Sequence, residues 1–167
     1  MANWIVSNNQ GGAGGNIFDD LVDFPAIANN YRLTTINHWS GNVLNGLQCV
    51  WVNPQGNVIV GNIHGEANGA AGTINLAAGE RIIFVHGRSG NRIDTLSLIV
   101  NDGEQLISRE APLLMYHIGR AITFGGNGGQ AFNWPINLVA NPNASLHHFR
   151  GRSAAQIDAA QAVFRQA

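Results

Sequence analysis

The stretch Gly87-Arg88-Ser89-Gly90-Asn91-Arg92-Ile93-Asp94-Thr95-Leu96 occurs in related form twice more along the chain. Its gapless counterparts are His38-Trp39-Ser40-Gly41-Asn42-Val43-Leu44-Asn45-Gly46-Leu47 and Gly151-Arg152-Ser153-Ala154-Ala155-Gln156-Ile157-Asp158-Ala159-Ala160. Each copy places a serine before a small residue, follows it with an aliphatic residue and then Asp or Asn, and continues into a strand-like run. Self-similarity of this kind indicates a fold assembled from repeated units.

A glycine-rich element alternates with this Ser-Gly element. It occurs as Gly11-Gly12-Ala13-Gly14-Gly15, as a looser form over residues 65–72, and as Gly125-Gly126-Asn127-Gly128-Gly129. A glycine loop is followed by a Ser-Gly loop three times over. Three similar sheets packed around a common axis would explain this order.

Short apolar runs separated by turn residues support an all-β fold. Leu47–Val52, Arg81–Val85 and Thr95–Val100 have strand length, and turn sequences such as Asn53-Pro54-Gln55-Gly56 separate them. This spacing favours a sandwich, barrel or prism over βαβ units. The segment from Ala154 to Gln166 is rich in Ala and Gln and has helical propensity, but its place in the third repeat predicts a strand.

Length and charge limit the classes of partner. The chain has 167 residues and a mass of 17.8 kDa, which fits one domain over 1–167. Only 11% of its residues are charged, and nine Arg with no Lys face ten acidic residues for a net charge of −1. This balance gives no electrostatic reason to expect nucleic acid or an anionic membrane as partner. No apolar run approaches the 18 or so residues of a transmembrane helix.

The compartment is predicted from the N-terminus and from cysteine usage. The first seven residues, MANWIVS, carry no basic region before an apolar run, so no secretory signal is visible. Cys49 is the single cysteine and is expected to be a buried, inert thiol. We therefore expect a cytoplasmic protein, or one released without a classical signal peptide.

Taken together, these motifs resemble those of the jacalin-related lectins. The resemblance is carried by Gly11–Gly15 with Phe18-Asp19-Asp20, by residues 87–94, by Asn101-Asp102-Gly103, by Gly125–Gly129 with Phe132, and by Phe149-Arg150-Gly151-Arg152-Ser153. It runs from about residue 10 to the end of the chain. It implies one jacalin-like lectin domain with the β-prism I fold, in which three four-stranded antiparallel sheets are related by pseudo-threefold symmetry.

The resemblance also implies how the loops would bind a sugar, because in this family a Gly-x-x-x-Asp loop and a glycine-rich loop form one site. The first site would combine residues 90–94 with residues 125–129. Asp94 would accept hydrogen bonds from the O4 and O6 hydroxyls, and the backbone amides of Asn91 and Arg92 would reach O5 and O6. The first loop also supplies Gly90, and the second loop supplies Gly128 and Gly129, with Gly129 near O3.

Two further sites follow from the other repeats. The second would use Asp158 as acceptor and Gly15 as amide donor, with Gly14, Ala155 and Gln156 around them. Ala154 replaces the motif glycine there, which would cost about 1 kcal/mol if the position required positive φ. The third would use Gly41, Asn45 and Gly72, and is expected to be weak because the Asn45 amide lacks the charge of a carboxylate.

The chemistry of such loops suits a neutral polyol. A carboxylate can accept hydrogen bonds from two adjacent hydroxyls, and glycine amides can approach an oxygen closely because no Cβ blocks them. At about 1 kcal/mol for each net hydrogen bond, a shallow site would hold one sugar at roughly millimolar strength. Because ten residues precede Gly11, mannose or glucose is expected rather than galactose, which in this family accompanies a chain processed at the glycine loop.

Other interpretations stay open at this point. Asp94 and Asp158 could cap turns, and the glycine clusters could serve only as tight corners. The alternative function is therefore a β-prism protein-interaction or assembly module without sugar binding. The apolar run within Glu104–Phe124, at residues 111–116, either extends a hairpin or forms a subunit interface in a homo-oligomer.

No motif points to catalysis, a cofactor or a metal. The six His show no ligand spacing, and adjacent His147 and His148 would point to opposite sides of a strand. The recurrence of Ser40, Ser89 and Ser153 at equivalent positions favours a structural role in turns over a nucleophile. Arg88 and Arg152 also recur and are expected to brace the loops. We therefore predict a glycan-binding protein that is not an enzyme.

Overall fold

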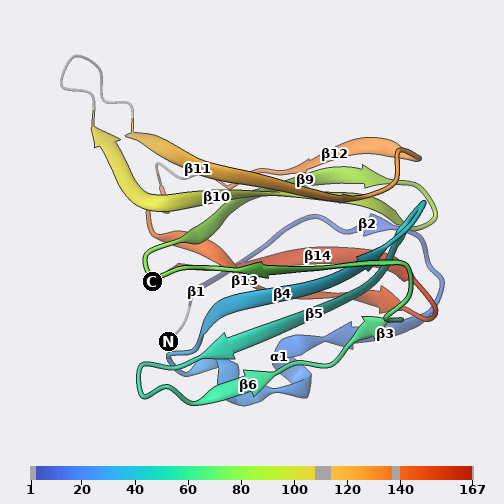
Figure 1. Ribbon diagram of the computed structural model, residues 1–167, viewed down its shortest axis with the longest axis horizontal. Coiled ribbons are helices and arrows are strands. Elements are labelled where there is room, and N and C mark those ends of the chain that lie inside the picture. The colour runs from blue at the N-terminus through green and yellow to red at the C-terminus, as the bar shows by residue number, and fades with distance from the viewer. Residues whose placement is uncertain (1–2, 108–113, 137–139, 167) are drawn as a thin grey trace.

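Three antiparallel sheets make up the protein in a computed structural model that describes residues 3–107, 114–136 and 140–166 (Figure 1). The first sheet contains β1 (Asn3–Val6), β2 (Gln10–Gly11), β3 (Asn16–Asp19), β13 (Ala144–Ser153) and β14 (Ile157–Gln166). The second contains β4 (Arg32–Ser40), β5 (Leu44–Val52), β6 (Val58–Val60), β7 (His64–Gly65) and β8 (Ala70–Asn75). The third contains β9 (Arg81–Ser89), β10 (Ile93–Ile107), β11 (Leu114–Gly125) and β12 (Gln130–Trp134).

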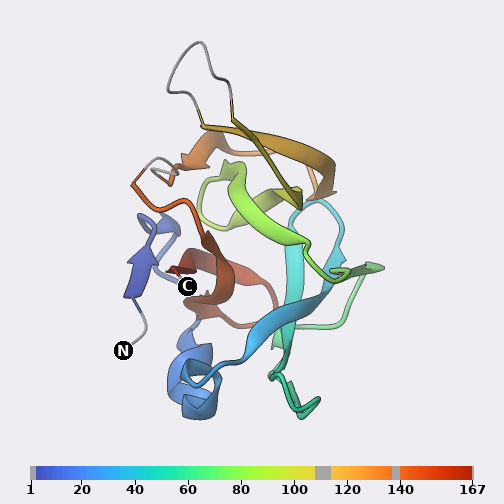
Figure 2. The same cartoon turned by 90° about the vertical axis from the view of Figure 1, so that its left-hand side faces the viewer.

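The sheets surround a common axis, as the view in Figure 2 shows. Each has the same strand order, β1-β14-β13-β3, β6-β5-β4-β8 and β11-β10-β9-β12. The outer strand is continuous only in the third sheet. In the other two it is divided, because β1 and β2 both pair with β14, and β6 and β7 both pair with β5. The predicted all-β prism of three four-stranded antiparallel sheets is confirmed, with the outer strand divided in two of the sheets.

The repeats seen in the sequence define equivalent connections in the three sheets. Each Ser-Gly loop is the hairpin between the two inner strands, at β4–β5, β9–β10 and β13–β14. Each glycine loop crosses from one outer strand to the other, at β2–β3, β7–β8 and β11–β12. Both loops of every repeat therefore meet at one end of the prism, the right-hand end in Figure 1.

The C-terminal segment forms a strand despite its helical propensity. β14 is an inner strand that pairs with β13 on one side and with β1 and β2 on the other. Ala159, Ala160 and Ala162 are fully buried in it, so tertiary packing outweighs local preference. The prediction of a strand is confirmed.

Large side chains from all three sheets fill the space around the axis. The core includes Trp51, Trp134, Phe149, Phe164 and Leu96, each with no more than 1% of its surface exposed. Cys49 also lies in this core, as predicted, and burial raises the pKa of its thiol. A buried thiol that resists ionisation is a poor nucleophile.

A buried acid–histidine pair fastens the short helical segment between β3 and β4 to the prism. This segment comprises α1 (Asp20–Asp23), capped by the Asp19 side chain, and the 3₁₀ turn η1 (Pro25–Ala28). Asp20 lies 2.6 Å from Nε2 of His64 and accepts a hydrogen bond from the Phe149 amide at 3.2 Å. The pair therefore links α1 to two sheets, a role that the sequence did not indicate for either residue.

The long hairpin of the third sheet extends beyond the other two. β10 and β11 pair as far as Ile107 and Leu114. This agrees with the hairpin interpretation of residues 104–124. The apolar run over residues 111–116 falls outside the described side chains, so the subunit interface stays a prediction. Within the described ranges, no helix is long and apolar enough to cross a membrane.

Candidate functional site

Asp94 and the last two residues of its glycine loop form one compact group. A methyl group placed on Gly128 or on Gly129 would lie 2.6 Å from one of the two Asp94 carboxylate oxygens. The φ angle of Gly129 is +71°, a conformation that a residue with a side chain rarely adopts. The carboxylate and the two glycines are thus brought together as predicted. Asn91 and Arg92, in the hairpin that leads to Asp94, are exposed.

Asp158 lies against the glycine loop over residues 11–15 as Asp94 lies against the loop over residues 125–129. A methyl group on Gly14 would lie 3.0 Å from its Oδ1, and one on Gly15 would lie 2.6 Å from its Oδ2. The φ angle of Gly15, +68°, matches that of Gly129. Within the part of the chain that the structure describes, Asp158 Oδ2 is buried without a hydrogen-bond partner. Asp158 therefore repeats the arrangement of Asp94, with one carboxylate oxygen against each of two glycines.

Ala154 does not disturb the second hairpin. The Ala154 amide donates to the carbonyl of Gln156 at 3.1 Å, as Gly90 donates to Arg92 and Gly41 to Val43, both at 3.0 Å. Neither Gly41 nor Gly90 has positive φ, so this position does not require glycine. A methyl group on Gly90 would have no neighbour closer than 3.9 Å. Ala154 therefore carries no conformational cost, because its position does not require a positive φ.

The third loop pair has the amide Asn45 where the other two have a carboxylate, and this side chain has a different partner. Asn45 donates through Nδ2 to the carbonyl of Asn68 at 2.9 Å, so the side chain is bonded to its own glycine loop. The glycine beside it is Gly69, with φ of +93°, and a methyl group there would lie 3.0 Å from Nδ2 of Asn45. The predicted Gly72 lies instead in β8, directly against the His38 ring. The loop spans residues 65–69, and its predicted extension to Gly72 was wrong.

Arginines support two of the three glycine loops. Arg88 donates to the carbonyls of Gly128 and Gly129 at 2.9 and 2.8 Å. Arg152 donates to the carbonyls of Gly14 and Gly15 at 3.0 and 2.9 Å. Trp39 occupies the equivalent position in the third repeat. The expected bracing role of the two arginines is confirmed, and the third loop has no arginine in its place.

The serines of the three repeats take part in the turns. The carbonyl of Ser89 lies against Gly129, that of Ser153 against Gly15, and that of Ser40 against Gly69. Ser40 and Ser89 are buried, and the Ser89 hydroxyl lies 3.2 Å from Oε1 of Gln10. These positions agree with a structural role.

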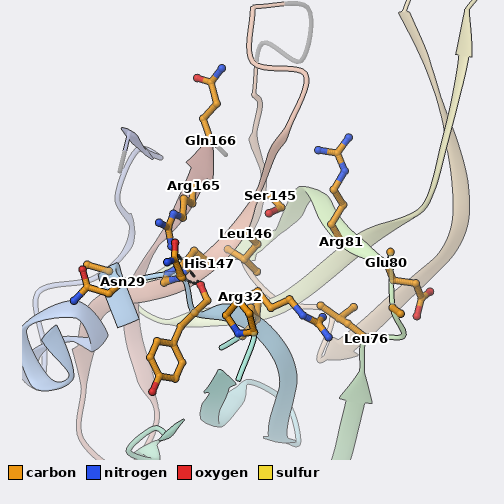
Figure 3. A pocket seen from close by; sticks show the side chains of 17 residues that line it. Asn29, Arg32, Leu76, Glu80, Arg81, Ser145, Leu146, His147, Arg165 and Gln166 are labelled. Carbon is orange, nitrogen blue, oxygen red and sulfur yellow. Dashed lines mark hydrogen bonds between the residues drawn. The ribbon is translucent and has the colours of Figure 1, made fainter. Parts of the chain in front are cut away.

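A cavity of about 930 Å³, drawn in Figure 3, lies at the opposite end of the prism, where β4 and β9 begin and β14 ends. Arg32, Arg81 and Arg165 line it, but Figure 3 shows their side chains spread around it rather than converging. Its carboxylate, Glu80, is paired with Arg120 at 3.0 Å. The one carboxylate of the cavity is thus already paired, whereas Asp94 and Asp158 each face two glycines, so the loop end is the better candidate.

Histidines do not form a metal site within the described residues, where no group of three or more His, Cys, Asp and Glu side chains is placed to hold an ion. His147 and His148 are both buried, and their Nδ1 atoms lie 2.9 Å apart. The expectation that they point to opposite sides of the strand was wrong, because the register shift in β13 between Leu146 and His148 breaks the alternation. Burial lowers the pKa of His147 to about 4 and that of His148 to about 3.

Comparison with known proteins places the chain among the lectins with this architecture. The family model of the Jacalin-like lectin domain matches residues 7–108, more than half of the chain. A mannose-binding jacalin-related lectin from Ananas comosus superimposes with a TM-score of 0.73 at 23% identity, with 96% of each chain covered. Wild-type Malaysian banana lectin gives a TM-score of 0.68 at 20% identity, with 97% of this chain and 98% of the banana chain covered.

A mannose-binding lectin from Champedak is also similar, with a TM-score of 0.67 at 21% identity and 98% of both chains covered. No curated protein sequence matches significantly. The structural neighbours establish the fold, and the match of the family model, together with the ordered repeats, establishes membership. The chain belongs to the Jacalin-like lectin domain family.

Proposed function

We propose that the protein binds glycans reversibly, without catalysis, through the Asp94 and Asp158 sites, and that it prefers mannose- or glucose-type sugars. The observation that carries the proposal is the identical grouping of a carboxylate, two exposed glycines and an exposed hairpin at both positions. The mannose-binding character of the Ananas comosus and Champedak lectins supports the choice of sugar.

In this proposal each group has its own part. The carboxylate accepts hydrogen bonds from two neighbouring hydroxyls, and the loop amides donate to ring and hydroxyl oxygens. The arginine behind each glycine loop fixes the loop carbonyls and so orients the amides on the other side. With few contacts to one sugar, each site binds weakly, and two sites on one face gain affinity for a surface that displays several sugars.

A glycan array that includes mannosides, glucosides and galactosides tests the proposal on the intact protein. We expect binding to mannose-rich glycans that free methyl α-mannoside competes away. Binding to galactosides alone would retain a lectin and overturn the proposed specificity. An empty array with a folded protein would contradict glycan binding and favour the protein-interaction module.

Substituting the bracing arginine should weaken binding without unfolding the protein. Arg88→Met keeps the length of the side chain but removes both hydrogen bonds to the loop carbonyls. We expect the affinity of the Asp94 site for methyl α-mannoside to fall about 5- to 20-fold, since the loop amides lose their fixed orientation. Titration calorimetry measures the loss.

Arg152→Met is the matched control, because it removes the same two bonds at the Asp158 site. The two substitutions should affect different sites and leave the melting temperature within a few degrees of the parent. Unchanged affinity in both variants would contradict a positioning role for these arginines.

A further inference from the structure

Neighbouring loop pairs at the binding end are in direct contact. A methyl group on Gly12 would collide with the carbonyl of Asn91, so the glycine loop of the Asp158 site packs on the hairpin of the Asp94 site. Gly126 meets the carbonyl of Asn42 in the same way, which places the glycine loop of the Asp94 site on the third hairpin. Each site is therefore bordered by a hairpin from the next sheet around the axis.

The residue that borders the Asp158 site is Arg92. Its Nε lies 3.9 Å from Asp158 Oδ1, and the guanidinium is half exposed, with 52% of the side-chain surface accessible. Within the described residues, this loose ion pair is the only polar contact of the guanidinium. The remaining N–H groups are therefore open to a ligand seated on Asp158.

The corresponding neighbour of the Asp94 site is Val43. Asn42 and Val43 occupy the positions in the third hairpin that Asn91 and Arg92 occupy in the second. Because Gly126 packs on Asn42 as Gly12 packs on Asn91, the equivalence of the repeats puts Val43 beside Asp94, at the position that Arg92 holds beside Asp158. Two otherwise similar sites thus differ in one bordering residue, which is cationic at one and apolar at the other.

We propose that Arg92 makes the Asp158 site selective for glycans that carry an acidic group beside the seated sugar. The inference rests on the proposed function, and it assigns a substrate class to one of its two sites. A guanidinium presents paired N–H donors that match a carboxylate, sulfate or phosphate, and such charge-assisted hydrogen bonds are stronger than neutral ones. The Val43 side chain beside the Asp94 site offers no such donor, so no preference for acidic glycans is expected there.

Isolating each site gives the test. In Asp94→Ala only the Asp158 site remains, and this variant is titrated with methyl α-mannobioside and with its analogues bearing a carboxylate, sulfate or phosphate on the second residue. We expect the acidic analogues to bind about fivefold more tightly than the neutral sugar at low salt. The preference should shrink at 0.5 M NaCl, where the charges are screened.

Arg92→Val in this background should remove the preference, so that the acidic and neutral mannobiosides bind with equal affinity. Arg92→Gln, which keeps most of the length without the charge, should do the same. Val43→Arg in an Asp158→Ala background should create the preference at the Asp94 site. Melting temperatures check that each variant is folded.

The outcomes separate the two proposals. If Asp94→Ala binds the neutral mannobioside and shows no preference for the acidic analogues, the assignment to Arg92 is overturned and glycan binding stays in place. The same follows if the preference for the acidic analogues survives Arg92→Val. Absence of binding to every mannobioside by the parent protein overturns both.

Discussion

Asp94→Ala is expected to abolish glycan binding at the first site, and to leave the Asp158 site intact, while the prism stays folded. The carboxylate is the only charged acceptor placed between the hairpin over 90–94 and the glycine loop over 125–129 among the described residues. Losing two charge-assisted hydrogen bonds of about 1.5 kcal/mol each lowers affinity about 100-fold. A site of millimolar strength would then fall below detection by titration calorimetry.

The conservative variant Asp94→Asn should lose nearly as much. An amide has no charge and offers one acceptor oxygen in place of two, so it cannot accept charge-assisted hydrogen bonds from two hydroxyls. Retained affinity in Asp94→Asn would contradict a charged acceptor at this position.

Matched substitutions at the other repeats serve as controls. Asp158→Ala should remove the second site alone, and Asp94→Ala combined with Asp158→Ala should eliminate binding. Asn45→Ala should change affinity less than twofold. Parent-like binding by the double variant would show that neither carboxylate contacts the sugar.

Acid is expected to destabilise the protein strongly because of His147 and His148. Burial, the largest cause in each case, lowers their pKa values to about 4 and about 3, against 6.5 in an unfolded chain. As the pH falls below 6.5, both histidines bind a proton in the unfolded chain but not in the native state, so the free energy of unfolding decreases. By pH 4.5 the loss amounts to about 3–5 kcal/mol, and it is complete near pH 3.

The geometry of the pair explains why the His147 ring stays neutral. His147 Nε2 lies 3.0 Å from the carbonyl of Tyr31 and donates to it, which leaves its Nδ1 as an acceptor. His148 Nδ1 then donates to that nitrogen across 2.9 Å. A proton added to His147 would place two N–H groups against each other.

Urea unfolding at pH 7.5, 6 and 4.5 measures this effect. His148→Asn should halve the dependence of the unfolding free energy on pH, since an amide can donate from a similar position without titrating. Asp20 works in the opposite direction, because burial raises its pKa and its folded form gains a proton as the pH falls. Equal stability at pH 7.5 and 4.5 would contradict neutral, buried histidines.

The sequence allowed the architecture to be predicted because the repeats are local patterns. Ser-Gly hairpins and glycine loops keep their order in every unit, so three equivalent sheets follow, and β14 could be assigned as a strand against its own propensity. The same alignment paired Asp94 with Gly128 and Gly129 correctly. The alignment misplaced only the end of the third glycine loop, because both Gly69 and Gly72 could be taken as its last glycine.

Contacts between distant segments could not be predicted. Asp20 and His64 are 44 residues apart, and Asp20 and Phe149 are 129 apart, with no motif that links them. Arg92 was expected to act through its backbone amide, but its side chain extends toward the neighbouring site. Such contacts depend on how the sheets pack around the axis, which a single sequence does not specify.

Binding of sugar at the prism end that carries Asp94 and Asp158 is the central claim, and amide chemical-shift mapping with methyl α-mannoside tests it most directly. The account predicts saturable shifts in residues 90–94, 125–129, 154–158 and 11–15, with little change in residues 41–45 and 65–69. Shifts confined to the arginine-lined cavity at the opposite end, or no shifts at tens of millimolar sugar, would contradict it.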